Sequence, residues 1–302
     1  DHPFNLDAYC HTGPMARSID DLILMQNVLC GPHPQDIVSI RPKLRIPREL
    51  KGIEGWKIAY SPDLGYVEID PEGRANTDAA LNGFRAAGAT VEEVELGWTW
   101  SSLTAAHTYL AHLFGTYIGR FLGRHALEMT TYARAFGEAG RRTTAEDFLQ
   151  AQEVAGEMYA ELGPILQRYD ALLCPTLAVP SVPATHDQSR DRVEINGREV
   201  DPVLGWTLTY PFNMLSRCPV ISVPTGFAGN RVPTGLQIVG RTYDDIGVCR
   251  AAKAYEAERR PATAKIVLAN RGNGPEQVMQ LVEERAPDGF ADISEVLSVD
   301  EL

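Results

Sequence analysis

The side chains best suited to metal or redox chemistry in this sequence are histidines and cysteines, and neither type is grouped as a metal site requires. His107 and His112 lie five residues apart in an aromatic-rich stretch with a helical pattern, whereas two histidine ligands on one helix face lie about four residues apart. The five cysteines are scattered and form no C-x-x-C pair, so neither a zinc site nor a disulfide framework is indicated. We expect structural histidines, no metal and no cofactor.

Common catalytic motifs are also missing. The chain has no G-x-S-x-G, Walker A, G-x-G-x-x-G, H-E-x-x-H or EF-hand pattern, which excludes an α/β-hydrolase nucleophile elbow and the usual phosphate and calcium loops. Cys174 and Cys218 each adjoin a proline, with no neighbouring base in the sequence to activate them. We expect both to be inert, buried thiols.

Two short apolar runs predict a buried hairpin. Val220–Val223 and Leu236–Val239 are β-branched and bounded by Pro and Gly, as buried strands are. Gly226–Pro233 between them fits a polar turn. The apolar spacing of Trp206–Ser216 predicts a helix that leads into this hairpin.

A strand–helix–strand unit is predicted earlier in the chain, over Trp56–Tyr60, Pro71–Ala87 and Thr90–Leu96, and this order favours parallel pairing. Ser18 is a plausible N-cap for a helix that Gly31 and Pro32 end. Its expected buried stripe is Leu22, Met25, Val28 and Leu29. Further predicted elements are helices over 103–126, 144–168 and 244–259, a strand at 170–175, an exposed excursion over 186–200, a possible strand at 265–269 and a possible helix at 275–285.

Composition limits the function classes. The 302 residues are 44% hydrophobic and 23% charged, as in a globular protein. The formal net charge of −12 argues against nucleic acid or an anionic membrane surface as a partner. The apolar runs are too short to span a bilayer, and the odd cysteine count without a signal peptide favours a cytoplasmic location.

Three motifs, in order along the chain, resemble the amidase signature family of serine amidohydrolases. They are GPMARSIDDLILMQNVLCGPHPQD from Gly13, YDALLCPTLAVPSVPA from Tyr169, and FNMLSRCPVISVPTG with PTGLQIVGRTYDD from Phe212. The resemblance implies an α/β fold with a mixed, largely central β-sheet and helices on both faces. Residues 1–260 would be the C-terminal part of such a domain. Residues 261–302, with eight acidic and three basic side chains, would be an acidic extension.

The family cleaves carboxamide C–N bonds with a nucleophilic serine, a serine in a cis peptide bond and a lysine, and a Gly/Ser-rich loop holds the oxyanion. None of the 26 glycines here precedes Gly or Ser, so that loop is absent. In the family these residues precede the GPMAR segment, near which this chain begins. The resemblance therefore implies that the catalytic residues lie on a preceding segment, and that none of them is in this chain.

By analogy with the family, substrate-contacting residues are expected at the ends of the DALLCPT and WTLTYPFN segments. Candidates are Thr176, Trp206 and Tyr210, with Met15 and Arg17 nearest in sequence to the absent loop. Core packing is an equal expectation for Trp206 and Tyr210, and ion pairing is the stronger expectation for Arg17. Asn213 and Gln237 are interpreted as structural hydrogen-bonding residues.

The predicted function is the pocket-forming part of an amidase that hydrolyses a small carboxamide or carbamate. Its partners would be the substrate and the N-terminal amidase segment, with a homodimer as a further possibility. Two alternatives remain open. One is an amidase-like subunit of a tRNA-dependent amidotransferase, and the other is a non-catalytic binding module derived from an amidase.

Overall fold

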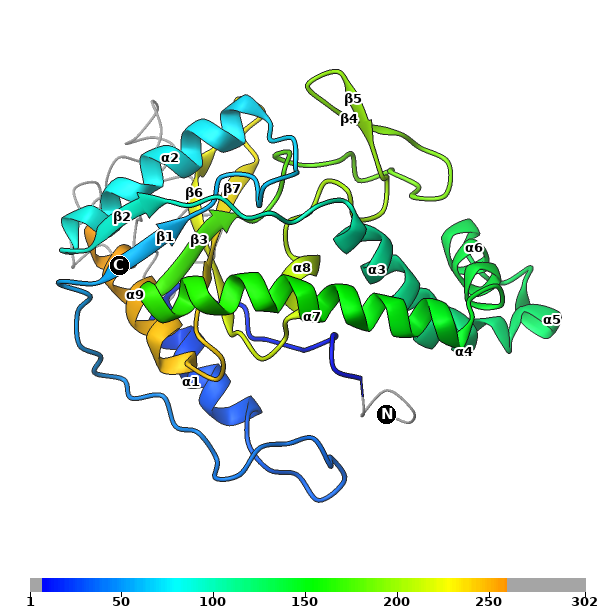
Figure 1. The fold of residues 1–302 in the computed structure, drawn as a ribbon, viewed down its shortest axis with the longest axis horizontal. Coiled ribbons are helices and arrows are strands. Elements are labelled where there is room, and N and C mark those ends of the chain that lie inside the picture. The colour runs from blue at the N-terminus through cyan, green and yellow to red at the C-terminus, as the bar shows by residue number, and fades with distance from the viewer. Residues whose placement is uncertain (1–6, 260–302) are drawn as a thin grey trace, which may run out of the picture.

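A mixed five-stranded sheet organises the chain in the computed structural model, which describes residues 7–259 (Figure 1). The strands run in the order β2 (Thr90–Glu93), β1 (Lys57–Tyr60), β3 (Ala171–Pro175), β7 (Pro233–Val239) and β6 (Val220–Phe227). Strand β1 pairs in parallel with β2 and β3, whereas β7 is antiparallel to β3 and β6. The predicted sheet class, the parallel strand–helix–strand unit and the hairpin are confirmed.

Helices cover both faces of the sheet and define two apolar cores. On one face α3 (Ser101–Leu110), α7 (Ala145–Arg168) and α8 (Tyr210–Met214) pack over side chains such as Leu172 and Val239. On the other face α2 (Pro71–Ala86), α9 (Asp245–Arg259) and α1 (Ile19–Leu29) pack over Leu173 and Ile238. Successive strand residues point to opposite faces, so one strand such as β3 contributes to both cores.

Local signals place several helix ends where the sequence predicts them. Asp70 caps α2, whose first residue is Pro71, and Gly88 follows that helix with a positive φ of 89°, the conformation that glycine adopts without strain. Thr144 and Asp147 form a reciprocal capping box at the start of α7, so that two otherwise unpaired N–H groups are satisfied.

The predicted buried stripe of α1 is wrong. Ile19 and Ile23 are the residues this helix buries, while Met25, Val28 and Leu29 are 44%, 73% and 56% exposed and Leu22 is half-buried. The helix packs on α9, and that contact selects a different face from the one that periodicity alone suggested.

The single helix predicted over 103–126 is interrupted. After α3 come a π-helical turn (Ala111–Gly115), α4 (Thr116–Gly119) and α5 (Leu122–His125), and the next segment forms α6 (Thr131–Gly140). Gly140 and Gly115 bring two helix backbones together so closely that a Cβ added at Gly140 would lie 2.1 Å from the Gly115 carbonyl carbon. This backbone contact has no signature in hydrophobic periodicity.

Two further predictions need correction. Residues 186–200 are not simply an exposed excursion, because they hold the hairpin of β4 (Val193–Ile195) and β5 (Arg198–Val200), with Val193, Ile195 and Val200 buried. Asn196-Gly197, both at positive φ, make its two-residue turn. The helix predicted over Trp206–Ser216 is confined to α8, because residues 206–208 run beside 176–178 in extended contact.

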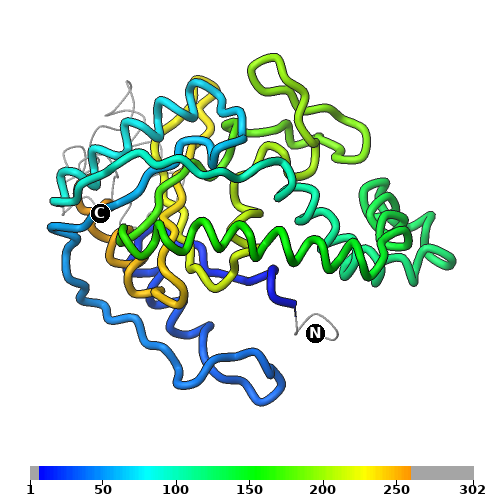
Figure 2. Tube along the Cα trace, viewed as in Figure 1, coloured from blue at the N-terminus to red at the C-terminus, as the bar shows by residue number. Residues whose placement is uncertain are grey.

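The long connection between α1 and β1 follows the outside of the molecule as an open arc (Figure 2). The proposed extension over 261–302, with its possible strand and helix, lies outside the described residues, and the boundary near 260 stays a prediction. Over residues 7–259 no helix is long and apolar enough to cross a bilayer. The same range contains no cluster of three or more His, Cys, Asp or Glu side chains suited to a metal ion.

Candidate functional site

A pair of hydroxyl groups lies where β3 and β6 approach the same end of β7. The Oγ1 of Thr176 and the Oγ of Ser222 are 2.8 Å apart. Gly235 of β7 lies between their strands, and a Cβ there would approach Thr176 Oγ1 to 3.0 Å and Ser222 Oγ to 3.2 Å. The absence of a side chain at Gly235 therefore makes room for the hydroxyl pair. Ser222 is exposed and Thr176 is half-buried.

The segment that carries the two aromatic candidates runs beside Thr176. The Leu208 N–H donates to the Thr176 carbonyl at 3.1 Å, and the Ala178 N–H donates to the Trp206 carbonyl at 2.9 Å. The structure thus brings Thr176 and Trp206 together, although they are distant in sequence, and places Tyr210 at the start of the adjoining helix α8.

Tyr210 belongs to a buried group of three hydroxyls. Its OH lies 2.6 Å from the OH of Tyr66, and the Ser102 Oγ donates to Tyr66 OH at 2.9 Å and to the Thr99 carbonyl at 2.8 Å. Burial raises the pKa of both tyrosines because it disfavours the phenolate. At neutral pH these groups are uncharged hydrogen-bond donors and acceptors, not bases.

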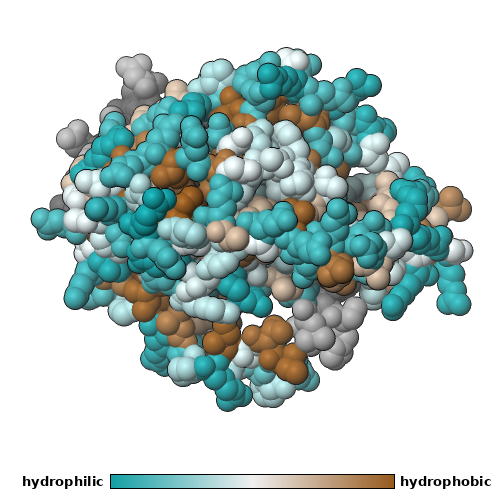
Figure 3. All heavy atoms as spheres, viewed as in Figure 1, coloured by the Kyte–Doolittle hydropathy of each residue, from teal (hydrophilic) through white to brown (hydrophobic). Residues whose placement is uncertain are grey.

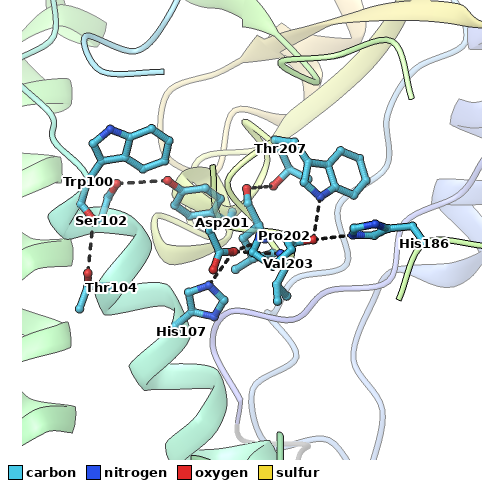
Figure 4. Close-up of polar contacts among 12 residues, drawn as sticks. Trp100, Ser102, Thr104, His107, His186, Asp201, Pro202, Val203 and Thr207 are labelled. Atoms are coloured by element: carbon cyan, nitrogen blue, oxygen red, sulfur yellow. Dashed lines mark hydrogen bonds and ion pairs between the residues drawn. The ribbon is translucent and has the colours of Figure 1, made fainter. Parts of the chain in front are cut away.

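An ion-pair contact fixes the turn that precedes Trp206 (Figure 4). His107 Nε2 of α3 lies 3.0 Å from Asp201 Oδ1, which also accepts from the N–H groups of Val203 at 3.0 Å and Leu204 at 2.7 Å. Burial alone would raise the pKa of Asp201, but these hydrogen bonds and the His107 charge outweigh it and lower the pKa to about 2.

Trp206 is held by the same turn. Its indole Nε1–H donates to the Pro202 carbonyl at 3.2 Å, and His186 Nε2 lies 2.9 Å from that oxygen (Figure 4). Because a carbonyl oxygen only accepts, His186 presents a protonated Nε2 to it. The half-buried indole is therefore held by one hydrogen bond to Pro202, whose carbonyl His186 also contacts.

The two amides that were interpreted as structural do hold chain segments together. Gln237 is 2% exposed, and its Nε2 donates to the carbonyls of Leu208 at 2.8 Å and Pro175 at 3.1 Å. Asn213 Nδ2 donates to the Tyr9 carbonyl at 2.7 Å. Cys174 and Cys218 are buried as predicted, and burial raises the pKa of Cys174 and brings that of Cys218 to about 11, which keeps both as thiols.

Met15 and Arg17 are not connected to this group. Met15 is 92% exposed and Arg17 is also exposed, and within residues 7–259 neither forms a hydrogen bond or ion pair with Thr176, Trp206 or Tyr210. The ion pair expected for Arg17 is not found among the described residues. Substrate contact by all five candidates stays a prediction.

Sequence reasoning missed four polar residues of this region. Ser222 stands inside a quoted motif, PVISVPTG, and the hairpin register pairs it with Gln237, two residues from Gly235. Tyr66, Ser102 and Asp201 come from separate elements, and no local pattern in the sequence joins them.

Taken together, the region offers uncharged hydroxyl donors, an oriented indole and no activated nucleophile. In the described part of the chain no lysine or histidine hydrogen-bonds to the hydroxyls of Thr176, Ser222, Tyr66, Tyr210 or Ser102. A serine or threonine hydroxyl attacks a carbonyl only with a base in hydrogen-bond reach. The arrangement can therefore bind and orient a polar group but does not by itself supply nucleophilic catalysis.

Comparison with known proteins places this chain in a family. The family model described as Amidase matches residues 7–249. An acylamidase from Rhodococcus erythropolis is 30% identical over 280 residues, which are 86% of this chain and 55% of that protein. A glutamyl-tRNA(Gln) amidotransferase subunit from Pseudothermotoga lettingae is 30% identical over 273 residues, with coverage of 81% and 55%.

Solved structures agree with the sequence relatives. A bacterial aryl acylamidase of the amidase signature family superposes with a TM-score of 0.75 at 26% identity, over 85% of this chain and 55% of that one. The chain thus spans little more than half the length of the proteins it matches. Since the family model covers most of the described residues and the fold agrees, this chain belongs to the Amidase family.

Proposed function

We propose that this chain forms the substrate-pocket side of an enzyme that hydrolyses a carboxamide or carbamate C–N bond through a serine acyl-enzyme. The observation that carries the proposal is the family match over residues 7–249, and the uncharged hydroxyl donors around Thr176 and Tyr210 support it. The serine, cis-serine and lysine would come from a preceding amidase segment.

Thr176, Trp206 and Tyr210 are proposed to contact the substrate, and the structure supplies a reason for each. Thr176 follows directly on β3, and open α/β sheets place ligands at strand ends. Trp206 offers an oriented apolar surface for an acyl or aryl group. Tyr210 carries a protonated hydroxyl that can donate to a carbonyl oxygen. Met15 and Arg17 are proposed to contact the substrate only once the remaining amidase segment lies beside them.

The test supplies the remaining segment. The chain is produced together with the part of the Rhodococcus erythropolis acylamidase that its match leaves out, and hydrolysis of 4-nitroacetanilide is followed by release of 4-nitroaniline. We expect activity that a fluorophosphonate abolishes and EDTA does not affect. Loss of activity on metal chelation, or full activity after fluorophosphonate treatment, would refute the serine mechanism.

Variants test the residue roles. Thr176→Val should lower kcat/KM by about three- to tenfold, the value of one neutral hydrogen bond. Thr104→Val, the same change at an exposed position of α3, is the matched control and should leave kcat/KM unchanged. Equal kcat/KM for the two variants would remove Thr176 from the pocket.

The match to amidotransferase subunits favours one second candidate, in which the ammonia released from an amide is passed to a partner protein. That role predicts a requirement for ATP and a charged tRNA. Undiminished amide hydrolysis in their absence, with no stimulation on addition, would argue against it.

A further inference from the structure

A cavity of about 280 Å³ lies between helix α2 and strands β1 and β2, and none of the five candidate site residues lines it. Helix α2 contributes Arg74, Asp78, Leu81 and Arg85 to its wall. These positions are i, i+4, i+7 and i+11, which share one face of a helix. In Figure 3 the surface over these elements, located by comparison with Figure 1, is mainly hydrophilic, with apolar side chains between the polar ones.

A polar network holds one arginine of the cavity in place. The Tyr60 hydroxyl donates to Asp78 Oδ1 at 2.7 Å, and Arg74 Nε donates to Asp78 Oδ2 at 2.9 Å. The guanidinium carbon of Arg74 lies 6.0 Å from the centre of the Tyr60 ring. Within residues 7–259 only the Nε of this guanidinium has a hydrogen-bond acceptor, so its two terminal amino groups can donate to a ligand.

The cavity also contains an acid and a base that form no ion pair with any described residue. Glu93 of β2 lines the wall and is exposed. Arg85 of α2 donates from Nη1 to the Asn82 side chain at 3.1 Å, which is a neutral partner. Each of the two side chains can therefore take a ligand group of opposite charge without first giving up an ion pair.

Glu93 and Arg85 lie towards opposite ends of the cavity. In a strand–helix–strand unit the helix returns along the strands, so the start of α2 lies beside the C-terminal ends of β1 and β2, as the contact of Tyr60 with the first half of α2 shows. Glu93 is the last residue of β2, and Arg85 is in the last turn of α2. Leu81 and Val91 line the wall between them.

We propose that this cavity binds an α-amino acid with an acidic side chain, for which L-glutamate is the model ligand. At one end the terminal amino groups of Arg74 bind the α-carboxylate and Glu93 binds the α-ammonium group. A guanidinium matches a carboxylate in shape as well as in charge. Leu81 and Val91 contact the methylene groups, and Arg85 binds the side-chain carboxylate at the other end. This inference does not depend on the proposed function.

The charge and the size of the cavity favour this ligand class over a simple anion. Two arginines and two carboxylates line it, so a ligand with charges of both signs complements it better than an anion alone. Its volume of about 280 Å³ lies just below the range of about 300–1,000 Å³ that is typical of drug-sized ligands, which suits a molecule as small as an amino acid.

The experiment titrates the isotope-labelled chain of 302 residues with L-glutamate and follows the backbone amides by NMR. We expect saturable shifts at residues 81–85 and 90–94, which weaken as salt is added because the charged groups are partly exposed. L-Lysine, which places a positive charge beside Arg85, should bind at least about tenfold more weakly, as expected for the loss of one charge-assisted hydrogen bond.

Three variants and two controls assign the roles. Arg74→Gln and Glu93→Gln should each raise the Kd for L-glutamate by about tenfold. Arg85→Glu should reverse the preference in favour of L-lysine, a change that a folding defect cannot produce. Arg142→Glu and Glu194→Gln alter exposed side chains that do not line the cavity and should leave the Kd unchanged. Circular dichroism shows whether each variant is folded.

Three results would overturn the inference. The first is the absence of any saturable shift with L-glutamate. The second is equal binding of L-glutamate, L-lysine, acetate and inorganic phosphate, which would reduce the cavity to a region of unspecific charge. The third is an Arg85→Glu variant that is folded and still prefers L-glutamate, which would place the ligand elsewhere.

Discussion

Asp201→Asn tests how the segment before Trp206 is held. Asparagine keeps the shape and one acceptor oxygen of the side chain, so the change removes chiefly the charge that faces His107 and two backbone N–H groups. Lowering the pKa of Asp201 from 3.8 to about 2 corresponds to about 2.5 kcal/mol of folding free energy. Because 27% of the side chain faces solvent, which screens the interaction, we expect a loss of about 1–2 kcal/mol at pH 7.

The sign of the pH dependence follows from the direction of this shift. A carboxyl group whose pKa is lower in the folded state binds protons less readily there than in the unfolded chain. Its contribution is therefore fully present above the ordinary value of 3.8 and is lost as pH falls toward about 2. The stability difference between the wild-type protein and Asp201→Asn should therefore shrink as pH falls from about 5 toward 2.

Urea unfolding followed by tryptophan fluorescence at a series of pH values measures this difference. Glu194→Gln is the matched control, because it neutralises an exposed carboxylate on the neighbouring strand β4 and should change stability by less than about 0.5 kcal/mol. A difference between wild type and Asp201→Asn that is absent at pH 7, or that grows as pH falls from 5 to 3, would refute the electrostatic reasoning.

Two further predictions concern close packing and buried polar groups. Gly140→Ala should destabilise the protein by about 2 kcal/mol or more, because the new Cβ would meet backbone atoms at 2.1 Å. Gly156→Ala on α7 has nothing within 4 Å of the new Cβ and should stabilise the protein by about 0.5–1 kcal/mol. Thermal unfolding measures both changes, and equal shifts in Tm would contradict this packing argument. Gln237→Leu should lower the free energy of unfolding by about 1–3 kcal/mol, because it leaves the Leu208 and Pro175 carbonyls without their donor. Ser61→Ala should be neutral or stabilising, since among residues 7–259 the Ser61 Oγ is a buried side-chain atom without a partner. A destabilising Ser61→Ala would point to a partner for that hydroxyl.

Elements whose ends carry their own signals could be predicted from the sequence. The start of α2 at Pro71, the capping box of α7 and the β6–β7 hairpin all depend on residues within a few positions of each other. The failures share the opposite property. The buried face of α1 is selected by α9, more than 200 residues away, and the π-helical turn after α3 packs on α6 through Gly115 and Gly140. Neither contact leaves a trace in periodicity.

The candidate site divides in the same way. Thr176 and Trp206 could be selected because each lies in or beside a motif of the family resemblance. Their proximity depends on the extended contact between residues 176–178 and 206–208, which also explains why the helix predicted from Trp206 is shortened. Tyr66 and Ser102 reach Tyr210 from two other elements, so no pattern along the chain could have assembled the three hydroxyls.

The hydroxyl groups of the candidate site depend on two separate features of the fold. Tyrosine hydroxyls whose pKa is raised by burial can donate to a carbonyl but cannot activate a nucleophile, and among the described residues no lysine or histidine hydrogen-bonds to them. Ser222 lies both in the hydroxyl pair with Thr176 and on β6, an outer strand of the sheet. The position of Ser222 thus rests on backbone register, whereas the uncharged state of the tyrosines rests on side-chain burial.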